Sequence, residues 1–513
     1  MRPDAGRGTR LGPAPRASGA RFGDSTVGSI VTGLARSLAG DLDRAHNDAR
    51  WALAGELRHL RVTGPGGGRL LLGRSARSQR GSIISGSTRS HRPLLATEKR
   101  HSVMVVGPTQ TYKTSGFAIP AILEWEGPVL AASVKGDLLS ETYAWRSCLG
   151  ECWVFDPASS TSWGSDGWCP LSACLDWVGA RRVASSLSRL ANRGGLEDGE
   201  FWYAASAKLL APLLFAAATA GLTMADVVRW VDTQESDEVL SVLQRSGCKQ
   251  ALHAWWASSN RETRQKSSIY TTAETVLEPF GDPEVGDIRI GWGIDVDRFL
   301  DGASHTVYLS SPSNEQARLQ PLFCALVEQV VNAVYDRSSS EGGPLSPPLL
   351  VVLDEAANIA PLATLDGLAS TAASHGIQLV TVWQDFSQLR SRYGERADTI
   401  VNNHRAKMFL SGISDVETLD YASRLGGEAR FRSSSTTRGS RGERSTTWQP
   451  ESRSLMPGAS VRRIAPGTGV LFYGHLPPAC LTLRPWFADP ELARRANGQP
   501  AQPITPRARN SIT

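Results

Sequence analysis

The stretch GPTQTYKTS, Gly107 to Ser115, decides how the rest of the chain is interpreted. It follows the apolar run SVMVV and precedes GFAIPAILEW, which has the pattern of a helix. A phosphate-binding P-loop has the form G-x-x-x-x-G-K-[ST] between a strand and a helix. Gly107, Lys113 and Thr114 occupy the required positions, but Tyr112 stands where the motif has its second glycine. The stretch is therefore a working nucleotide site, an inactive relic or a chance match.

In a P-loop, backbone N–H groups of a tight loop and a helix N-terminus point at phosphate. Lys113 is expected to reach the β- and γ-phosphates of ATP, and the Thr114 hydroxyl to bind Mg²⁺. A positive φ at Tyr112 costs roughly 1–2 kcal/mol, whereas micromolar nucleotide binding amounts to about 8 kcal/mol. If position 112 needs a positive φ, this penalty weakens the predicted site without removing it. A Tyr112 ring that blocks the phosphate is the more severe alternative, which the sequence leaves open. The predicted nucleotide-binding residues are Gly107, Pro108, Thr109, Gln110, Thr111, Tyr112, Lys113, Thr114 and Ser115.

An acidic pair ends the apolar stretch PPLLVVLDEAANI, where Asp354 and Glu355 follow a run typical of a buried strand. A P-loop ATPase holds its Walker B carboxylates in this place. Asp354 is expected to hold the hydration shell of Mg²⁺, and Glu355 to polarise the attacking water. The alternative is an Asp-Glu pair that caps a helix. Gln384 ends the next apolar stretch, IQLVTVWQ, where it contacts the γ-phosphate or its water, or is a solvent-facing turn residue.

Strand patterns and helical patterns alternate from about residue 100 onwards. The alternation predicts βαβ units and a mostly parallel sheet, and the continuously apolar strands indicate that both sheet faces are covered. From about Arg181 to Glu278 only helical periodicity is present, which predicts an all-helical insertion. The expected strands are SVMVVG, GPVLAASV, ECWVFDP, HTVYLSS, PLLVVLDE, IQLVTVWQ and AKMFLSG, and a closing hairpin pairs GTGVLFYG with ACLTLRPWF.

These patterns predict an α/β nucleotide-binding domain with a helical insertion and several linking segments. The domain consists of residues 99–180 and 280–490, and the insertion of residues 181–279. The remaining predicted segments are a basic disordered arm at 1–25, a helical and linker region at 26–98, a flexible Ser/Arg-rich loop at 430–448 and a disordered tail at 491–513.

Composition limits the class of protein. The chain has 513 residues, of which 41% are hydrophobic and 20% charged, as in soluble globular proteins. The net charge is only +5, so any attraction to nucleic acid must be local. The seven cysteines show neither a zinc-site spacing with a second pair nor a disulfide framework, which indicates a cytoplasmic compartment. The most apolar stretch, Leu209 to Leu222, is shorter than a membrane span and predicts a buried core helix in a soluble chain.

Four stretches give the chain a resemblance to a known family. They are VMVVGPTQTYKTSGFAIPAILEWEGPVLAASVKGDLLSET, WVFDP, LLVVLDEAANIAPLATLDGLASTAASHGIQLVTVWQDFSQLRSRYG and ADTIVNNHRAKMFLSGISDVETLDYASRLGG. In these the chain resembles the coupling proteins of type IV secretion and conjugation, the TraG/TraD family of DNA-transfer ATPases, in an actinobacterial form. The resemblance implies a RecA-like P-loop NTPase domain with an all-helical insertion, and ATP and Mg²⁺ as cofactors. It also implies hexameric rings that drive single-stranded DNA, with bound relaxase, toward the components of a secretion channel.

The resemblance places Lys113, Thr114, Asp354, Glu355 and Gln384 at the family's nucleotide-site positions. It implies catalytic roles for Lys113, Glu355 and Gln384, and a site for Mg²⁺ at Thr114 and Asp354.

Other residues of the matching stretches have two interpretations each. Arg405 in NNHRAK is a candidate catalytic arginine that reaches a neighbouring subunit's γ-phosphate, or a structural surface arginine. Lys135 and Asp137 in SVKGDL follow a strand end, where ligands gather in such sheets, or cap a helix. Candidate DNA contacts, otherwise solvated loop residues, are Arg430, Arg432, Arg438, Arg441 and Arg444.

Members of the family usually carry N-terminal transmembrane helices, and none is visible in this sequence. The expected location is therefore the cytoplasm, at the inner face of the plasma membrane, with membrane contact through partners. Two other functions stay open. One is a hydrolytically silent P-loop scaffold that recruits the relaxosome, and the other is an FtsK-like translocase of double-stranded DNA.

Overall fold

The computed structural model describes residues 49–76, 78–79, 82–83, 92–191, 199–312, 314–438 and 444–499. The predicted basic arm at 1–25 lies outside these residues, and so does Arg441. The chain divides into two compact units, one of residues 1–49 and 428–453 and the other of residues 50–427 and 454–513. The second, larger unit contains the candidate nucleotide-site residues.

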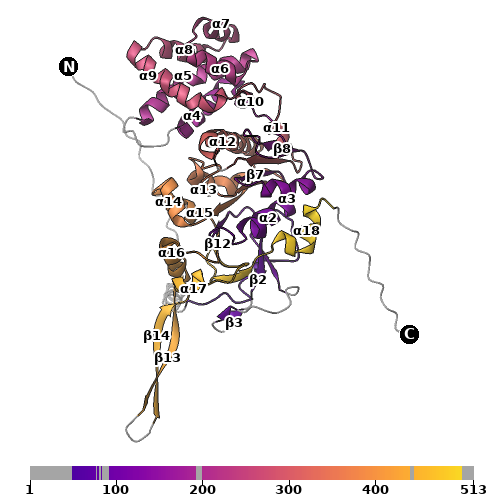
Figure 1. Ribbon diagram of the computed structural model, residues 1–513, viewed down its shortest axis with the longest axis vertical. Coiled ribbons are helices and arrows are strands. Elements are labelled where there is room, and N and C mark those ends of the chain that lie inside the picture. Colours follow the sequence, from indigo (N-terminus) through magenta and orange to yellow (C-terminus); the bar gives the residue numbers. More distant parts are fainter. Residues whose placement is uncertain are drawn as a thin grey trace, which may run out of the picture. The chain divides into compact units, whose positions relative to one another are not determined.

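The larger unit is built on one sheet, shown in Figure 1. Its strands, in spatial order, are β1 (Arg61–Val62), β5 (Leu94–Ala96), β2 (Leu71–Ser75), β16 (Ala479–Thr482), β15 (Thr468–Tyr473), β12 (Ala406–Leu410), β6 (Val103–Val106), β11 (Ile377–Trp383), β10 (Leu349–Leu353), β7 (Val129–Ser133), β9 (Thr306–Ser310) and β8 (Cys152–Phe155). The strands from β12 to β8 are parallel to one another. From β12 to β1 each neighbouring pair is antiparallel. All seven strands predicted after residue 100 are present, and so is the closing hairpin, as β15 and β16.

The central parallel strands are buried along their whole length because helices cover both faces of the sheet. Along β10, Leu349, Val351 and Leu353 belong to one hydrophobic core, and Leu350 and Val352 to the other. The first core contains residues of α12 (Gln316–Glu341), α13 (Leu365–His375), α14 (Phe386–Tyr393) and α15 (Arg396–Asn403). The second contains residues of η3 (Thr114–Ala118), α2 (Ile119–Glu124), α3 (Asp137–Arg146) and α18 (Pro490–Ala496). The predicted α/β fold class is therefore confirmed.

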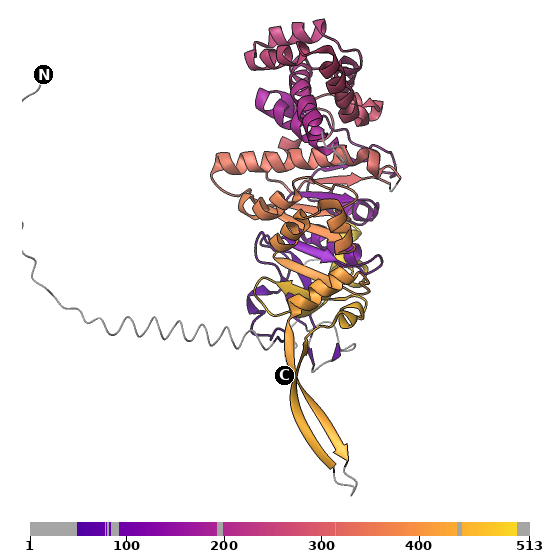
Figure 2. The same ribbon diagram turned by 90° about the vertical axis from the view of Figure 1, so that its left-hand side faces the viewer.

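Every described element between β8 and β9 is helical. The elements are η4 (Pro170–Cys174), α4 (Trp177–Ala191), α5 (Gly199–Ala220), α6 (Met224–Asp232), α7 (Asp237–Ser246), α8 (Lys249–Ser259), α9 (Thr263–Leu277), η5 (Glu278–Gly281), α10 (Pro283–Gly286) and α11 (Val296–Phe299). The helical segment therefore extends beyond the predicted range of 181–279 at both ends. The long helix α12 runs between these helices and the sheet, as Figure 2 shows.

Helix α5 is the one helix of the described chain that is long and apolar enough to cross a membrane. Its apolar window is 67% buried inside the protein, because α4, α8 and α9 pack around it. The apolar run from Leu209 to Ala218 is buried almost throughout, which confirms the prediction of a core helix there.

Within the predicted helical and linker region at 26–98, the helical part is wrong for the described residues. From residue 49 onwards it contains the short 3-10 helix η1 (Arg58–Leu60), the strands β1, β2 and β5, and the short pair β3 (Ser78–Gln79) and β4 (Ser82–Ile83). Leu60 is fully buried, and β1 pairs with β5 at the edge of the sheet. Pairing with distant strands therefore overrides the local helical periodicity.

The predicted flexible loop at 430–448 is also wrong. Its described residues lie in two strands, β13 (Glu428–Arg438) and β14 (Arg444–Ser454), which pair with each other in a two-stranded sheet. Its sequence is polar but rich in threonine, with Phe431 and Trp448 in the two strands, and such residues favour strands. The backbone groups of a hairpin pair with each other, so the segment forms strands without a large apolar core.

The predicted disordered tail at 491–513 begins too early. Helix α18 occupies Pro490–Ala496, and the Asp489 side chain accepts a hydrogen bond from the N–H of Glu491 at its start. Leu492 is fully buried in the same core as α2. Asp489 followed by Pro490 is a helix-start signal, which the polar composition of the segment obscured.

His404 is buried between β11 and α15 and takes part in a chain of hydrogen bonds. Its Nδ1 lies 2.7 Å from the carbonyl oxygen of Ile400, and its Nε2 lies 3.0 Å from Oγ1 of Thr381. The indole N–H of Trp383 donates to the same hydroxyl at 2.9 Å. A carbonyl only accepts, so Nδ1 carries the proton and Nε2 accepts. Burial lowers the pKa of His404 to about 4.

We expect acidification to destabilise the protein through His404. The unfolded chain protonates this side chain near its ordinary pKa of about 6.5, whereas the folded chain does so only near 4. The contribution of neutral His404 to the free energy of unfolding is complete above the pKa in the unfolded chain. It is lost as the pH falls toward the pKa in the folded chain. By pH 5 the free energy of unfolding should drop by about 2 kcal/mol from this group alone.

Urea unfolding at pH 7 and pH 5 tests this expectation. His404→Gln should remove this part of the acid sensitivity, because an amide keeps a donor and an acceptor without titrating. The same change at the exposed His59 should leave the sensitivity as in the wild type. A His404→Gln variant that loses as much stability as the wild type would show that other groups are responsible.

Candidate functional site

The candidate site lies where the central parallel strands end. Strands β6, β11, β10 and β7 are parallel neighbours, so their carboxyl ends reach the same edge of the sheet, where ligands bind in such folds. The P-loop follows β6, and Gln384 follows β11. Asp354 and Glu355 follow β10, and Lys135 and Asp137 follow β7. The sheet thus brings together predicted site residues that are far apart in the sequence.

One hydrogen bond joins the P-loop helix to the end of β10. The Thr114 hydroxyl donates to Oδ2 of Asp354 at 2.8 Å. Asp354 is only 3% exposed, and burial raises its pKa to about 6 against the opposing effect of the Thr114 hydroxyl. Its other oxygen, Oδ1, is buried and has no hydrogen-bond partner in the described chain. The two side chains are therefore linked, with one carboxylate oxygen left over.

This arrangement fits Mg²⁺. A carboxylate and a hydroxyl are oxygen ligands of the kind that Mg²⁺ takes, and the unpartnered Oδ1 of Asp354 offers a ligand that the protein does not use. Within the described residues no group of three or more His, Cys, Asp or Glu side chains could hold a metal ion by itself. Mg²⁺ usually keeps waters and shares one or two carboxylates with substrate phosphates, so Thr114 and Asp354 suit a phosphate-bound ion.

Lys113 lies inside the loop and is 7% exposed. Its Nζ donates to the carbonyl oxygens of Gly107 and Pro108, both at 2.6 Å. Burial lowers the pKa of this ammonium group, and the carboxylates of Asp354 and Glu355 oppose the shift. The charge is thus placed within the loop, where a phosphate group would compete with the two carbonyls for it.

Tyr112 adopts the backbone conformation that the motif reserves for glycine. Its φ is 67°, and the φ of Gln110 is 63°. Position 112 therefore has the positive φ at which a non-glycine residue is strained. The side chain packs against the core that contains α2, and its ring centroid lies 6.4 Å from that of Phe487. The ring lies outside the loop interior that Lys113 fills, so it does not block the predicted phosphate position.

Gln384 follows β11, the strand next to β6, and Glu355 follows β10, the strand after that. Glu355 is half-buried and has a φ of 59°, and its Oε2 accepts a hydrogen bond from Nδ2 of Asn358 at 3.3 Å. Gln384 is half-buried at the end of β11, between the P-loop strand and the strand that carries the carboxylates. Its N–H donates to Oε1 of Gln388 at 3.2 Å. Both side chains are thus at the edge where the sequence places them.

Three further charged residues belong to this edge. Asp137 is half-buried and burial raises its pKa. Its charge also contributes to the raised pKa of Asp354. The exposed Lys135 and the half-buried Asp385 act electrostatically on Lys113. Asp385 was not predicted, although its place directly after the strand IQLVTVW is a signal of the same kind as that of Asp354. The carboxylates of Asp137 and Asp385 also accept hydrogen bonds from backbone N–H groups at the starts of helices.

Arg405 is not part of this group. It precedes β12, which is parallel to β6 and pairs Ala406 with Val103 at its first residue. Arg405 therefore lies at the amino end of its strand, at the opposite edge from the P-loop. The side chain is exposed and its guanidinium group lies against Gly474. It does not act on the nucleotide site of its own chain, and action on a neighbouring subunit stays a prediction.

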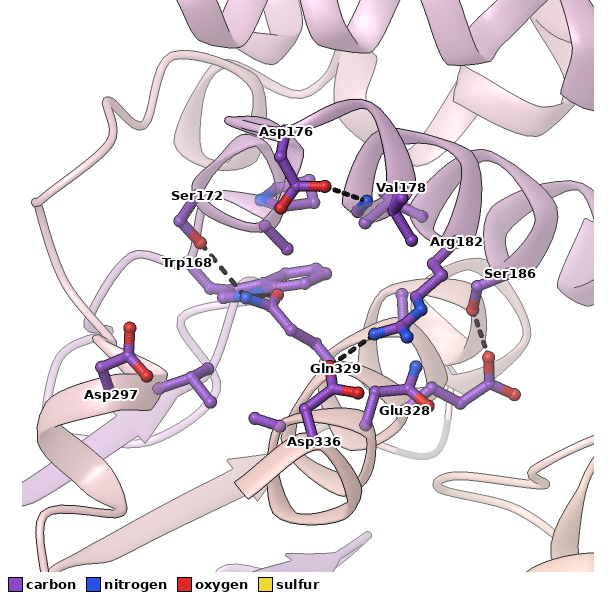
Figure 3. Close-up of a pocket in the computed structure, with 18 of the residues that line it drawn as sticks. Trp168, Ser172, Asp176, Val178, Arg182, Ser186, Asp297, Glu328, Gln329 and Asp336 are labelled. Atoms are coloured by element: carbon purple, nitrogen blue, oxygen red, sulfur yellow. Dashed lines mark hydrogen bonds and ion pairs between the residues drawn. The ribbon is translucent and has the colours of Figure 1, made fainter. Parts of the chain in front are cut away.

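A cavity of about 490 Å³ lies away from the P-loop, between η4, α4, α11 and α12 (Figure 3). Its polar groups are largely engaged with one another. The indole N–H of Trp168 donates to Oε1 of Gln329 at 2.9 Å, and Arg182 of α4 forms an ion pair with Asp336 of α12 at 2.5 Å. Ser186 of α4 donates to Glu328 of α12. The cavity is thus a polar seam between the helical segment and α12, not a second phosphate site.

The sequence model of a known protein family matches most of the chain. The model for type IV secretory system conjugative DNA transfer covers residues 52–506. The conjugal transfer protein TraG of Escherichia coli is 26% identical, over 94% of this chain and 84% of that protein. The protein VirD4 of Rhizobium radiobacter is 24% identical, over 88% of this chain and 65% of that protein.

Solved structures share the fold. The plasmid coupling protein TrwB in complex with ADP and Mg²⁺ has a TM-score of 0.58 and 20% identity, over 82% of this chain and 96% of that one. TrwB in complex with a non-hydrolysable GTP analogue has a TM-score of 0.56 and 19% identity, over 83% and 96%. These likenesses confirm the predicted RecA-like α/β fold. The chain therefore belongs to the coupling proteins of type IV secretion and conjugative DNA transfer.

Proposed function

We propose that this chain is an ATP-driven motor that recruits relaxase-bound single-stranded DNA and moves it toward a type IV secretion channel. The observation that carries the proposal is the hydrogen bond from Thr114 to Asp354, with Lys113 and Glu355 at the same edge. It joins the P-loop helix to the strand that ends in carboxylates, which is the arrangement that P-loop ATPases use. Membership of the family supports DNA as the cargo.

Each side chain has a role that follows from its position. Lys113 holds the β- and γ-phosphates, and Thr114 and Asp354 hold Mg²⁺, which spreads the negative charge of the phosphates when it is bound. Glu355 orients a water molecule and accepts its proton. It stands next to Asp354 and is less buried, so solvent can reach its carboxylate. Gln384 lies between the loop and the carboxylates and orients the same water or the terminal phosphate.

The proposed assembly is a homo-hexameric ring. Arg405 lies on the edge of the sheet opposite to the P-loop, which suits an arginine that acts on a neighbouring subunit rather than on its own. The proposed location is the cytoplasmic face of the plasma membrane, with membrane contact through secretion-channel partners.

A second candidate function is a silent scaffold that recruits the relaxosome without hydrolysis. The observation that favours it is the strained loop, in which Gln110 and Tyr112 both have a positive φ. Strain of this kind costs of order 1–3 kcal/mol per residue. The cost is smaller than a micromolar nucleotide affinity, so the motor is the better supported of the two functions.

Nucleotide binding separates these functions first. Tyr112→Gly should keep or improve the affinity for a non-hydrolysable ATP analogue, by up to about tenfold if roughly 1.4 kcal/mol of strain is relieved. Lys113→Ala should weaken binding and abolish hydrolysis, because it removes the charge inside the loop. Lys208→Ala, at an exposed lysine of α5, is the control and should change neither. Calorimetry in which the wild type and Lys113→Ala both fail to bind would leave the scaffold as the function.

Hydrolysis tests the role of Glu355. Glu355→Gln should bind ATP nearly as well as the wild type, while turnover falls by about 10²-fold or more, the scale of a lost general base. The amide preserves the shape of the side chain and the bond to Asn358. Glu341→Gln, at an exposed glutamate of α12, should turn over normally. Unchanged turnover of Glu355→Gln would remove this residue from the mechanism.

DNA binding is expected to depend on phosphates and therefore on salt. Affinity for single-stranded DNA should fall steeply between 50 and 200 mM salt, as is typical of proteins with several phosphate contacts (roughly 10³-fold for six). Binding should show little sequence preference.

ATP turnover should rise with single-stranded DNA more than with duplex DNA. A stronger stimulation by duplex DNA would favour the translocase of double-stranded DNA. A variant with Gln at the five candidate arginines should show a shallower salt dependence of DNA affinity than the wild type.

Light scattering in the presence of nucleotide and DNA tests the proposed ring. If it detects only monomer, the proposed hexamer is wrong.

A further inference from the structure

The segment after β16 returns to the P-loop from the side opposite to the carboxylates. Strand β15 is antiparallel to β12, and β16 is antiparallel to β15, so β16 runs parallel to β6. The chain therefore leaves β16 at the same edge as the P-loop. The short helix η6 (Trp486–Ala488) then contacts η3, the first turn of the P-loop helix. A Cβ at Gly116 would lie 3.1 Å from Cβ of Tyr112 and 3.3 Å from Cβ of Leu483.

Buried ion pairs fix this segment on the P-loop helix. Arg484 is 9% exposed, and its two terminal nitrogens donate to the carboxylate of Glu124, at the end of α2, at 2.9 and 3.1 Å. Its Nε donates to Asp489 at 3.0 Å. Arg484 precedes η6 and Asp489 follows it, so both ends of η6 are held. Such bidentate, desolvated pairs restrict geometry strongly, and η6 is therefore a rigid element beside the loop.

Phe487 is the exposed aromatic residue of this element. Its side chain is 55% exposed, although two aromatic rings lie beside it. Its ring centroid lies 6.4 Å from that of Tyr112 and 5.9 Å from that of Trp486, in an edge-to-face arrangement with the latter. Trp486 packs against the core that contains α2. The element thus presents one large exposed ring beside Tyr112 of the P-loop, and an aromatic ring in such a place can stack on a nucleobase.

The order of the strands gives the direction of a bound nucleotide. Asp354 and Glu355 follow β10, on one side of β6, and Phe487 follows β16, on the other side. The loop with Lys113 lies between them. A nucleotide whose terminal phosphate meets Mg²⁺ at Asp354 therefore extends its ribose and base away from β10, toward η6.

We propose that Phe487 forms the stacking surface for the nucleobase, and that Tyr112 supports its ring from below. The proposal rests on the proposed nucleotide site and adds the residue that distinguishes a nucleotide from a plain chain of phosphates. Stacking uses the face of the base, which every base has. The surface therefore favours purine nucleotides over tripolyphosphate but discriminates little between adenine and guanine.

The test compares three ligands in the presence of Mg²⁺: non-hydrolysable analogues of ATP and GTP, and inorganic tripolyphosphate. Phe487→Ala should weaken binding of both nucleotides by about tenfold, the effect of one lost stacking contact, and leave tripolyphosphate affinity unchanged. Phe487→Tyr should restore nucleotide affinity. Phe201→Ala removes an equally exposed ring from α5 and should change none of the three affinities. Position 112 is unsuitable for this test, because Tyr112→Gly combines strain relief with loss of a ring.

Two results would overturn the proposal while leaving the nucleotide site intact. One is a Phe487→Ala variant that binds all three ligands like the wild type. The other is an equal loss for nucleotides and tripolyphosphate, because η6 would then support the loop and not the base. A wild-type protein that binds none of the three ligands would instead remove the nucleotide site, and the stacking surface with it.

Discussion

The larger unit depends on one constraint, which is that the central strands are covered on both faces. Strands β6, β7, β10 and β11 are buried along their whole length. An ionised side chain within them would lose its hydration at a large cost in free energy. Ionised groups are therefore confined to the strand ends, and parallel pairing brings ends of the same kind to one edge. Asp354 is the first residue after β10 and is still almost fully buried. A candidate ligand of Mg²⁺ therefore follows the buried strand directly.

The same edge concentrates backbone strain. Gln110, Tyr112 and Glu355 all have a positive φ without being glycine, a conformation that costs free energy and persists only where the surroundings enforce it. In the loop, Gln110 and Tyr112 flank Thr111, and the neighbouring Lys113 donates to the carbonyl oxygens of Gly107 and Pro108. At the end of β10, Glu355 is half-buried and accepts a hydrogen bond from Asn358, while Asp354 is almost fully buried and bonds to Thr114. Two neighbouring carboxylates thus have different environments, as their different proposed roles require.

Local patterns in the sequence predicted the parts of the site that follow apolar strands. The spacing of the P-loop and the run before Asp354 are signals of this kind, and strand direction alone would have placed Arg405 at the opposite edge. Phe487 carries no such signal. Its position depends on two antiparallel reversals, at β15 and β16, and on the ion pair of Arg484 with Glu124, which joins residues far apart in the chain. Long-range pairing of this kind leaves no periodicity in the sequence.

Helix α12 connects the nucleotide edge to the helical segment. Near its start, Gln320 donates to the carbonyl oxygen of Asn358 at 2.7 Å, and the amide of Asn358 donates to Glu355. Two turns further along, Glu328 accepts hydrogen bonds from α4, including one from Arg189 at 2.8 Å. A helix moves as a nearly rigid body, and packed interfaces shift between discrete arrangements. The hydrogen bonds from Glu355 through Asn358 to Gln320, and from Glu328 to α4, therefore connect the candidate nucleotide edge with the helical segment along one helix.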